Sequence, residues 1–180
     1  MCLAGPGSGK TTVLTGRVHN LIKEHKVRPE NILVITFTKA AATEMQTRFY
    51  NLCQSKLPVT FGTFHAVFFS ILKAAYNYSV DNILKEEEKE RIIRQAIEKY
   101  HPETNDMADT VHRLKEEISK VKAERINISA YYSLNCPAEI FRNIYVYYEK
   151  CLENGKLLDF DDMLLYCYEL LTERKDILKK

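Results

Sequence analysis

The sequence predicts an α/β fold in which a small parallel sheet precedes a long segment made only of helices. Residues 1–80 alternate between short apolar runs, typical of buried strands, and stretches with apolar residues at helical spacing. From residue 81 to residue 156 only the helical spacing continues. The length of 180 residues suits one domain, or a domain that carries an insertion.

Strands and helices alternate in the first part of the chain. The predicted strands are residues 1–3, 32–35 and 59–61, and the continuous Ile-Leu-Val-Ile run of the second is typical of a strand buried on both faces. The predicted helices carry Val13, Leu14, Val18, Leu21 and Ile22, then Ala41, Ala42, Met45, Phe49 and Leu52, then residues 66–76. This alternation implies a parallel sheet with right-handed crossovers.

Four helices are predicted after residue 80. Asp81 can cap the first of them, and Pro102 ends it. The second follows Asp106, and its apolar seam predicts an antiparallel helical pair. The seam residues are Val111, Leu114, Ile118 and Val121. The third helix runs from near Pro137 to just before Gly155, and the last begins within residues 157–162.

Composition and charge exclude several classes of protein. The chain is 46% hydrophobic and 28% charged, with 6 Gly and 5 Pro, so it is neither collagen-like nor disordered. It shows no transmembrane run and no secretory signal, and its 5 cysteines include no CxxC pair. We therefore expect a cytoplasmic protein without membrane contact. Residues 1–80 hold nine Lys and Arg against three acidic residues, which favours an anionic partner.

The most informative motif is Ala-Gly-Pro-Gly-Ser-Gly-Lys-Thr at residues 4–11, a phosphate-binding P-loop with alanine in place of the first glycine. Its glycines let backbone N–H groups curl around a phosphate. Lys10 is expected to reach the β- and γ-phosphates, and the Thr11 hydroxyl is expected to bind Mg²⁺. ATP with Mg²⁺ is therefore the expected cofactor. The expected nucleotide-binding residues are Ala4, Gly5, Pro6, Gly7, Ser8, Gly9, Lys10, Thr11 and Thr12.

An acidic residue at the end of a strand, which a P-loop enzyme needs for its Mg²⁺, is not found in the predicted sheet. Asp159, Asp161 and Asp162 follow two leucines and precede a helical stretch. Either Asp159 caps that helix while the other two favour its dipole, or these residues bind the metal directly, and we favour the cap. The short sheet predicts that the chain is a piece of a larger enzyme.

Four segments, in family order, resemble motifs of the UvrD/Rep-type superfamily 1 DNA helicases. Residues 3–12 resemble motif I, residues 35–45 motif Ia, residues 62–65 motif Ib, and residues 158–164 the DFDDLL element. Motif Ia departs from the family's TFTNKAA, because Lys39 replaces the asparagine and Ala40 the lysine. The resemblance covers nearly the whole chain.

The resemblance implies the N-terminal piece of an ATP-dependent 3′-to-5′ DNA helicase of the kind used in DNA repair. Residues 1–80 and 157–180 would form an incomplete RecA-like domain, and residues 81–156 its inserted helical subdomain. Motifs Ia and Ib line the single-stranded DNA path in the family, which makes Phe37, Thr38, Thr63 and His65 the DNA-binding candidates. The implied partners are single-stranded DNA, duplex junctions and the C-terminal part of the same protein. Without Walker B acids and arginine motifs, this piece is expected to bind nucleotide but not to hydrolyse it.

Simpler alternatives remain for these candidates. Phe37 can be a core residue, His65 can bond a local backbone group, and Thr38 can cap the next helix. Tyr131, Tyr132, Tyr145, Tyr147 and Tyr148 can stack on bases, but a helix core stripe is favoured. Lys115, Lys120 and Lys122 can contact duplex DNA, but they alternate with Glu116, Glu117 and Glu124, which favours a solvated face.

Two other classes of function stay open. One is a helicase–nuclease subunit or another P-loop NTPase. The other is a non-catalytic interaction module with a vestigial phosphate loop, although the intact Gly9-Lys10-Thr11 argues against it.

Overall fold

The computed structural model describes residues 9–101 and 103–174, and its contacts divide the chain into two compact units, Met1–Val67 and Phe68–Lys180. Helices and a small parallel sheet make up the described part, which confirms the predicted α/β class. The strand expected at residues 1–3 lies outside the described residues. The predicted division into 1–80 with 157–180 against 81–156 stays a prediction.

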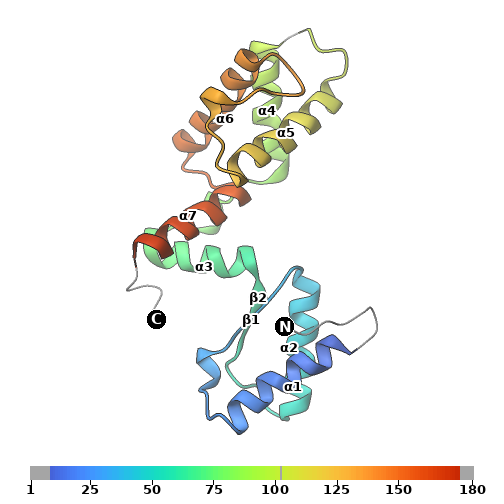
Figure 1. Cartoon of the computed structure of the whole chain (residues 1–180), viewed down its shortest axis with the longest axis vertical. Helices are drawn as coiled ribbons and strands as arrows, with labels where there is room; N and C mark the ends of the chain where they lie inside the picture. The colour runs from blue at the N-terminus through green and yellow to red at the C-terminus, as the bar shows by residue number, and fades with distance from the viewer. Residues whose placement is uncertain (1–8, 102, 175–180) are drawn as a thin grey trace. The chain divides into compact units, whose positions relative to one another are not determined.

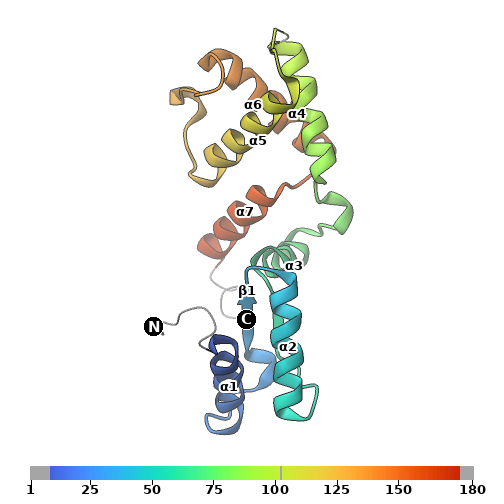
Figure 2. The ribbon, with the colours of Figure 1, turned by 90° about the vertical axis from the view of Figure 1, so that its right-hand side faces the viewer.

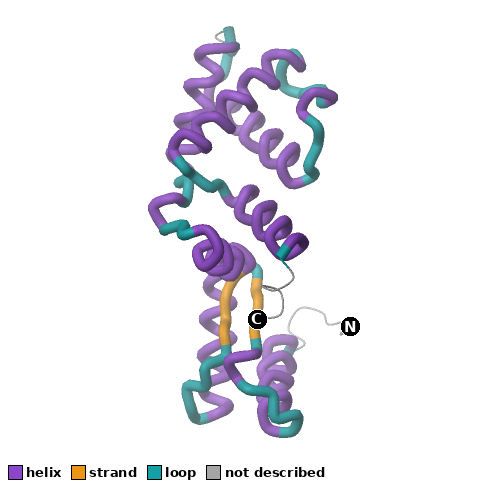
Figure 3. The backbone as a smooth tube through the Cα atoms, turned by 90° about the vertical axis from the view of Figure 1, so that its left-hand side faces the viewer, coloured by secondary structure: helices purple, strands orange, loops and turns teal. Residues whose placement is uncertain are grey.

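The first unit is built on two parallel strands, β1 (Leu33–Thr36) and β2 (Thr60–Thr63), drawn in orange in Figure 3. α1 (Lys10–Lys23) precedes β1, with the short 3₁₀ turn η1 (Pro29–Asn31) between them, and α2 (Lys39–Cys53) connects the strands. α2 packs against both the sheet and α1 (Figure 1). The two parallel strands and the helix between them form a β-α-β unit, as the alternation of strands and helices predicts.

The core of the first unit lies between the sheet and its helices. Val18, Ile32, Phe49 and Val59 are its buried residues, and the rings of Phe49 and Phe61 lie 5.6 Å apart. Val34 packs against this core, whereas Leu33, which follows the alternation of a strand to the opposite face, is 47% exposed. The expectation of a strand buried on both faces is therefore wrong for the described part of the sheet. Val13 and Leu14 of α1 are also exposed.

The secondary structure described for the second unit consists of helices. α3 (Phe64–Tyr76) begins directly after β2, two residues earlier than predicted, and residues from 68 onward belong to this unit. The other long helices are α4 (Glu86–Tyr100), α5 (Met107–Ala123), α6 (Ala138–Gly155) and α7 (Phe160–Glu173), with the 3₁₀ turns η2 (Val80–Asn82) and η3 (Ile128–Ala130). In the described part of 81–156 the only strand-like contact is an isolated parallel bridge between Ile83 and Leu158.

Two apolar clusters hold the second unit together. Helices α4, α5 and α6 share the larger cluster, and Figure 2 shows them side by side. All four seam residues predicted for α5 are buried in it. The smaller cluster joins the later part of α3 to α7 through Leu72, Leu158, Met163, Cys167 and Leu170. α7 therefore packs on α3 while its first turn also contacts α5.

Some of the helix caps predicted from the sequence are present in the structure, and others are not. Asp106 caps α5 by accepting a hydrogen bond from the Asp109 N–H (3.1 Å), as predicted. Asp81 does not cap α4, because it lies inside η2, where Ser79 and Asn82 cap each other. Gly155 is the last residue of α6, and Lys156 rather than a glycine adopts the left-handed conformation that ends the helix (φ 49°).

None of the described helices combines the length and the apolar character that crossing a bilayer requires.

Candidate nucleotide and nucleic-acid site

The start of α1 has the features of a phosphate-binding helix end. Gly9 precedes α1 with a φ of 78°, in the left-handed region that favours glycine. A Cβ there would meet no atom of residues 9–101 or 103–174 within 4 Å, so the positive φ is what calls for glycine. α1 has no side-chain cap, and its first turn contains no acidic residue. The first N–H groups and their partial positive charge therefore suit a phosphate.

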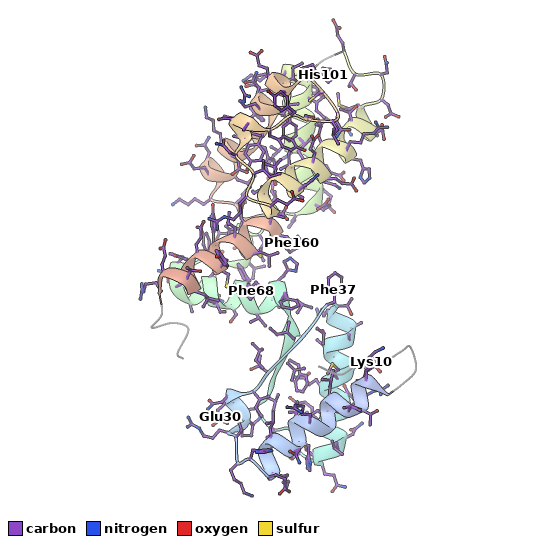
Figure 4. All side chains as sticks on the ribbon, viewed as in Figure 1. Lys10, Glu30, Phe37, Phe68, His101 and Phe160 are labelled. Atoms are coloured by element: carbon purple, nitrogen blue, oxygen red, sulfur yellow. The ribbon has the colours of Figure 1, made fainter. Side chains whose placement is uncertain are left out.

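The nucleotide-binding candidates that the structure describes lie together at this end. Lys10 is the first residue of α1 and is exposed at its N-terminus (Figure 4), and Thr11 and Thr12 follow in the first turn. The Thr15 hydroxyl, in the next turn of α1, is within hydrogen-bonding distance of the carbonyls of Thr11 (3.0 Å) and Thr12 (3.1 Å). These contacts hold the first turn in place. Ala4, Gly5, Pro6, Gly7 and Ser8 lie outside the described residues.

The four DNA-binding candidates meet at one edge of the sheet. β1 and β2 are parallel and in register, with Thr36 paired to Thr63 as their last residues. The residues after each strand, Phe37 and Thr38 on one side and Phe64 and His65 on the other, therefore follow at the same carboxyl edge. Open α/β sheets bind their ligands at this edge.

Phe37 is the most exposed large apolar side chain of this edge. It is 92% exposed, and its ring projects outward at the start of α2 in Figure 4. The alternative that Phe37 is a core residue is therefore wrong. Such a ring can stack on a base, which is how many proteins hold single-stranded nucleic acid.

The two threonines among the DNA-binding candidates, Thr38 and Thr63, act as helix caps. The Thr38 hydroxyl accepts a hydrogen bond from the Ala41 N–H (3.2 Å), which confirms the capping alternative. Thr63 does the same for α3 by accepting from the Ala66 N–H (3.3 Å), a role that the sequence reasoning missed. Thr36 donates to the Thr38 carbonyl (2.9 Å) and so fixes the turn that presents Phe37. His65, in the first turn of α3, is half-buried.

The Asp159–Asp162 segment lies in a buried network of charges. We call it the Lys122 junction, and its members are Lys89, Lys122, Tyr148, Glu149, Asp159 and Asp162. The Lys122 ammonium, on a residue only 5% exposed, lies 2.9 Å from Asp159, 2.7 Å from Asp162 and 3.0 Å from Glu149. Lys122 thus joins α5 to α6 and to the first turn of α7.

Asp159 is both a helix cap and an ion-pair partner. It accepts the Asp162 N–H (2.7 Å), which confirms the predicted cap, and it also accepts the Tyr148 hydroxyl (2.8 Å). In the described residues no group of three or more His, Cys, Asp or Glu side chains is placed to hold a metal ion. The structure therefore gives the alternative of direct metal binding by Asp159, Asp161 and Asp162 no support.

The junction shifts the pKa values of its members. Burial opposes the charge on Lys122, but the surrounding carboxylates raise the pKa of its ammonium above the usual value. Burial likewise opposes the charge of Asp159, while Lys122 lowers its pKa below the usual value. Burial and the charge of Asp159 raise the pKa of Asp162 to about 7, although Lys122 acts in the opposite direction.

The prediction of a solvated face is wrong for two residues of α5. Lys122 is buried in the junction, and Glu117 is 6% exposed. The Glu117 carboxylate accepts hydrogen bonds from the loop after η3, whose donors are the Tyr131 hydroxyl (2.9 Å), the Ser133 hydroxyl (2.9 Å), the Leu134 N–H (3.0 Å) and the Asn135 amide (2.7 Å). The sequence held a signal for the burial of both residues that was overlooked, because each lies three or four positions from an apolar seam residue.

Four of the five tyrosines considered for base stacking are core residues, as favoured. Tyr148 is fully buried, and Tyr131, Tyr145 and Tyr147 pack against the same cluster. Tyr132 is the exception, with 81% of its surface exposed. Its loop is fixed by Glu117 through the neighbouring residues and not through Tyr132 itself.

Comparisons with known proteins identify the family of the chain. Residues 1–180 match the family described as the UvrD/REP helicase N-terminal domain. Over 94% of its length the chain is similar to the ATP-dependent DNA helicase SRS2 of Saccharomyces cerevisiae (32% identity), and over 99% to DNA helicase II of Rickettsia typhi (32%) and the ATP-dependent DNA helicase PcrA of Staphylococcus aureus (28%). It spans 17%, 28% and 25% of their respective lengths, less than a third in each case. The whole-chain match shows that this protein belongs to the UvrD/REP helicase N-terminal domain family.

Proposed function

We propose that this chain is the nucleotide- and DNA-binding N-terminal part of an ATP-dependent 3′-to-5′ DNA helicase. ATP-Mg²⁺ binds through residues 4–12, with Lys10 on the β- and γ-phosphates and the Thr11 hydroxyl on Mg²⁺. Single-stranded DNA binds through Phe37, Thr38, Thr63 and His65. The family membership and the helicases named above support this reading.

The observation that carries the proposal is the shared carboxyl edge of β1 and β2. In-register pairing of Thr36 with Thr63 brings the residues after both strands to one edge, where an exposed phenylalanine lies beside the N-termini of α2 and α3. Residues 1–67 also hold eight Lys and Arg against three acidic residues. A stacking ring, helix N-termini and positive charge together suit a single strand.

The DNA-binding part is tested with labelled single-stranded DNA at low and high salt. For a partial binding path we expect a Kd of roughly 10⁻⁴–10⁻⁶ M that weakens as salt rises, since phosphate binding releases counterions. Phe37→Ala removes the exposed ring and is expected to weaken binding several-fold. Tyr132→Ala is the matched control, because it removes another highly exposed ring from the helical unit. Equal affinities of wild type and Phe37→Ala would remove Phe37 from the DNA path.

The nucleotide part is tested by titration with ATP in the presence and absence of Mg²⁺. Lys10→Ala is expected to abolish binding, and Thr11→Ala to reduce the gain from Mg²⁺. Lys23→Ala, which removes an exposed lysine from the other end of α1, is the control. Unchanged ATP binding by Lys10→Ala would contradict the proposed phosphate site.

We also propose that the chain alone binds ATP without turning it over. Asp159 and Asp162, which the sequence offered as possible Mg²⁺ ligands, are instead paired with Lys122. An arginine of the kind supplied by a second domain contributes roughly 10³–10⁵ in rate in related phosphoryl transfers. A phosphate-release assay tests this. Turnover at an ordinary enzyme rate that disappears in Lys10→Ala would contradict it.

The proposed insertion of residues 81–156 is supported by the contacts at its two ends. Leu158 donates its N–H to the Asn82 carbonyl (2.7 Å), and the Asn82 amide donates to the Lys156 carbonyl (2.8 Å). A segment whose ends lie side by side can be replaced by a short turn. A chain with residues 84–155 replaced by a short glycine linker is therefore expected to keep ATP binding, and loss of both folding and binding would argue against the division.

A further inference from the structure

The Lys122 junction holds more negative than positive charge. Three carboxylates, those of Glu149, Asp159 and Asp162, share the ammonium groups of Lys89 and Lys122, and the neighbouring Asp161 lies 3.6 Å from Lys89. Asp159 and Asp162 are both buried, and the same lysine nitrogen contacts both of them. Like charges held this close in a buried site repel each other strongly, and one of them is readily neutralised by a proton.

The hydrogen bonds distinguish the two aspartates. Asp159 accepts from three donors, namely the Lys122 ammonium (2.9 Å), the Tyr148 hydroxyl (2.8 Å) and the Asp162 N–H (2.7 Å). A carboxylate with three donors is strongly held in its charged form. Among the described residues, the Asp162 carboxylate has Lys122 as its one side-chain partner. Glu149 is 38% exposed at its side chain, so water can stabilise its charge.

Of the groups that face Asp162 from the neighbouring elements, two carboxylates favour its neutral form and one lysine opposes it. α6 contributes Glu149, Tyr145 and Tyr148, and the residue that caps α7 is Asp159. Tyr78 and Tyr166 face it from the loop after α3 and from α7. α5 contributes Lys122, and α4 contributes Lys89, which lies 3.6 Å from Asp161 and 3.9 Å from Asp159. Within the described parts of the chain, Lys122 is the one cation in direct contact with Asp162.

A cleft connects Asp162 with solvent. It has a volume of about 580 Å³, and its lining includes Tyr78, Glu149, Asp162 and Tyr166. A proton can therefore leave or reach the carboxyl group without unfolding of the core. This access separates Asp162 from a carboxyl group sealed in the protein interior.

We propose that Asp162 carries a proton while the first turn of α7 is held on α5 and α6, and that release of this proton frees that turn from the helical core. Ionised Asp162 would place a second full negative charge beside Asp159, and Lys122 would no longer balance both. The inference does not rest on the proposed helicase function. The pKa of about 7 given above for Asp162 agrees with it.

The expected pH dependence follows from the sign of that shift. The pKa of Asp162 is raised from 3.8 in the folded chain, so the closed form keeps a proton that the open form has lost. Opening of the turn is therefore favoured as pH rises from about 4 to about 7, by up to about tenfold per pH unit for one proton, and levels off above that range. Asp159 has the opposite shift, and its contribution to stability is lost only as pH falls below about 4.

Hydrogen exchange of the backbone amides in the first two turns of α7 tests the proposal. Protection factors, which are corrected for the intrinsic pH dependence of exchange, are measured between pH 5 and pH 8 in wild type and in Asp162→Asn. We expect protection in wild type to fall by as much as about tenfold per pH unit up to pH 7, and protection in Asp162→Asn to be independent of pH. Asp109→Asn, the same change in the exposed first turn of α5, is the matched control and should behave as wild type.

Two results would overturn the proposal. One is a wild-type protection factor that does not change with pH, and the other is an unchanged slope in Asp162→Asn. If Asp162→Asn does not fold, the carboxyl carbon of Asp162 is titrated by NMR in the wild-type chain. A midpoint near pH 7 would support the proposal, and a midpoint below pH 5 would refute it.

Discussion

Removal of the Glu117 carboxylate should open the loop that follows η3. This carboxylate is buried, and it accepts four hydrogen bonds from residues 131–135 at distances of 2.7–3.0 Å. A hydrogen bond to a charged group contributes roughly 1.5–3 kcal/mol, but the released donors can bond to water once the loop opens. We therefore expect Glu117→Ala to lower the free energy of unfolding by about 3 kcal/mol, well below the sum of four bonds.

Glu117→Gln separates the charge from the shape of the side chain. Glutamine keeps one acceptor oxygen, which can still serve the Tyr131 hydroxyl and the Leu134 N–H, but its amide nitrogen cannot accept from Ser133 or Asn135. We expect a loss of about half that of the alanine variant, roughly 1.5 kcal/mol. Glu116→Gln is the matched control. Glu116 is the neighbouring glutamate, exposed and 3.5 Å from His112, so its loss should cost less than about 0.5 kcal/mol.

Urea unfolding measures the three free energies, and hydrogen exchange of the Leu134 amide reports on the loop itself. The amide donates to Glu117 although the Leu134 side chain is 90% exposed, so its protection depends on this one acceptor. It should be protected in wild type and in Glu116→Gln and exchange freely in Glu117→Ala. A loss below about 1 kcal/mol in Glu117→Ala, or an unprotected Leu134 amide in wild type, would refute the assigned role of the buried carboxylate.

Four other changes have expected outcomes. Asp106→Ala removes the cap of α5 and should cost about 1 kcal/mol in urea unfolding. Gly9→Ala places a Cβ at a φ of 78°, which costs roughly 1–2 kcal/mol at the start of α1, and it should weaken ATP binding in a titration. Lys156→Gly relieves the left-handed residue after α6 and should raise the melting temperature by a few degrees. Lys122→Met leaves the buried Asp159 carboxylate without its main cation, and it should lower the free energy of unfolding by about 3–5 kcal/mol at pH 5.

Local signals in the sequence predicted much of the helical unit. The caps at Asp106 and Asp159 depend on backbone groups three residues away, so the residue types near them are sufficient to identify them. The seam of α5 is equally local, because apolar residues three and four positions apart share one face of a helix. The parallel order of the strands also follows from the alternation of strands and helices.

The charged groups of the core could not be placed in the same way. The partners of Lys122 lie 27–40 positions along the chain, at Glu149, Asp159 and Asp162, and those of Glu117 lie 14–18 positions away. A lysine or glutamate on a helix is usually solvated, and only a distant partner makes its burial favourable. The one local signal was that Glu117 and Lys122 lie on the apolar face of α5. The mixture of Lys and Glu residues along that helix concealed it.

α1 differs from the other long helices of the described chain in how its N-terminus is stabilised. Thr38, Thr63, Asp106 and Asp159 cap α2, α3, α5 and α7. α4 and α6 have no side-chain cap, but each has acidic residues in its first turn to match the helix dipole. α1 has neither device, because Gly9 has no side chain and the first turn is Lys-Thr-Thr-Val. A helix end without a cap or an acidic residue gives up about 1 kcal/mol of stability. That loss is compensated when a phosphate occupies the end, and so the feature that weakens α1 in isolation supports the proposed nucleotide site.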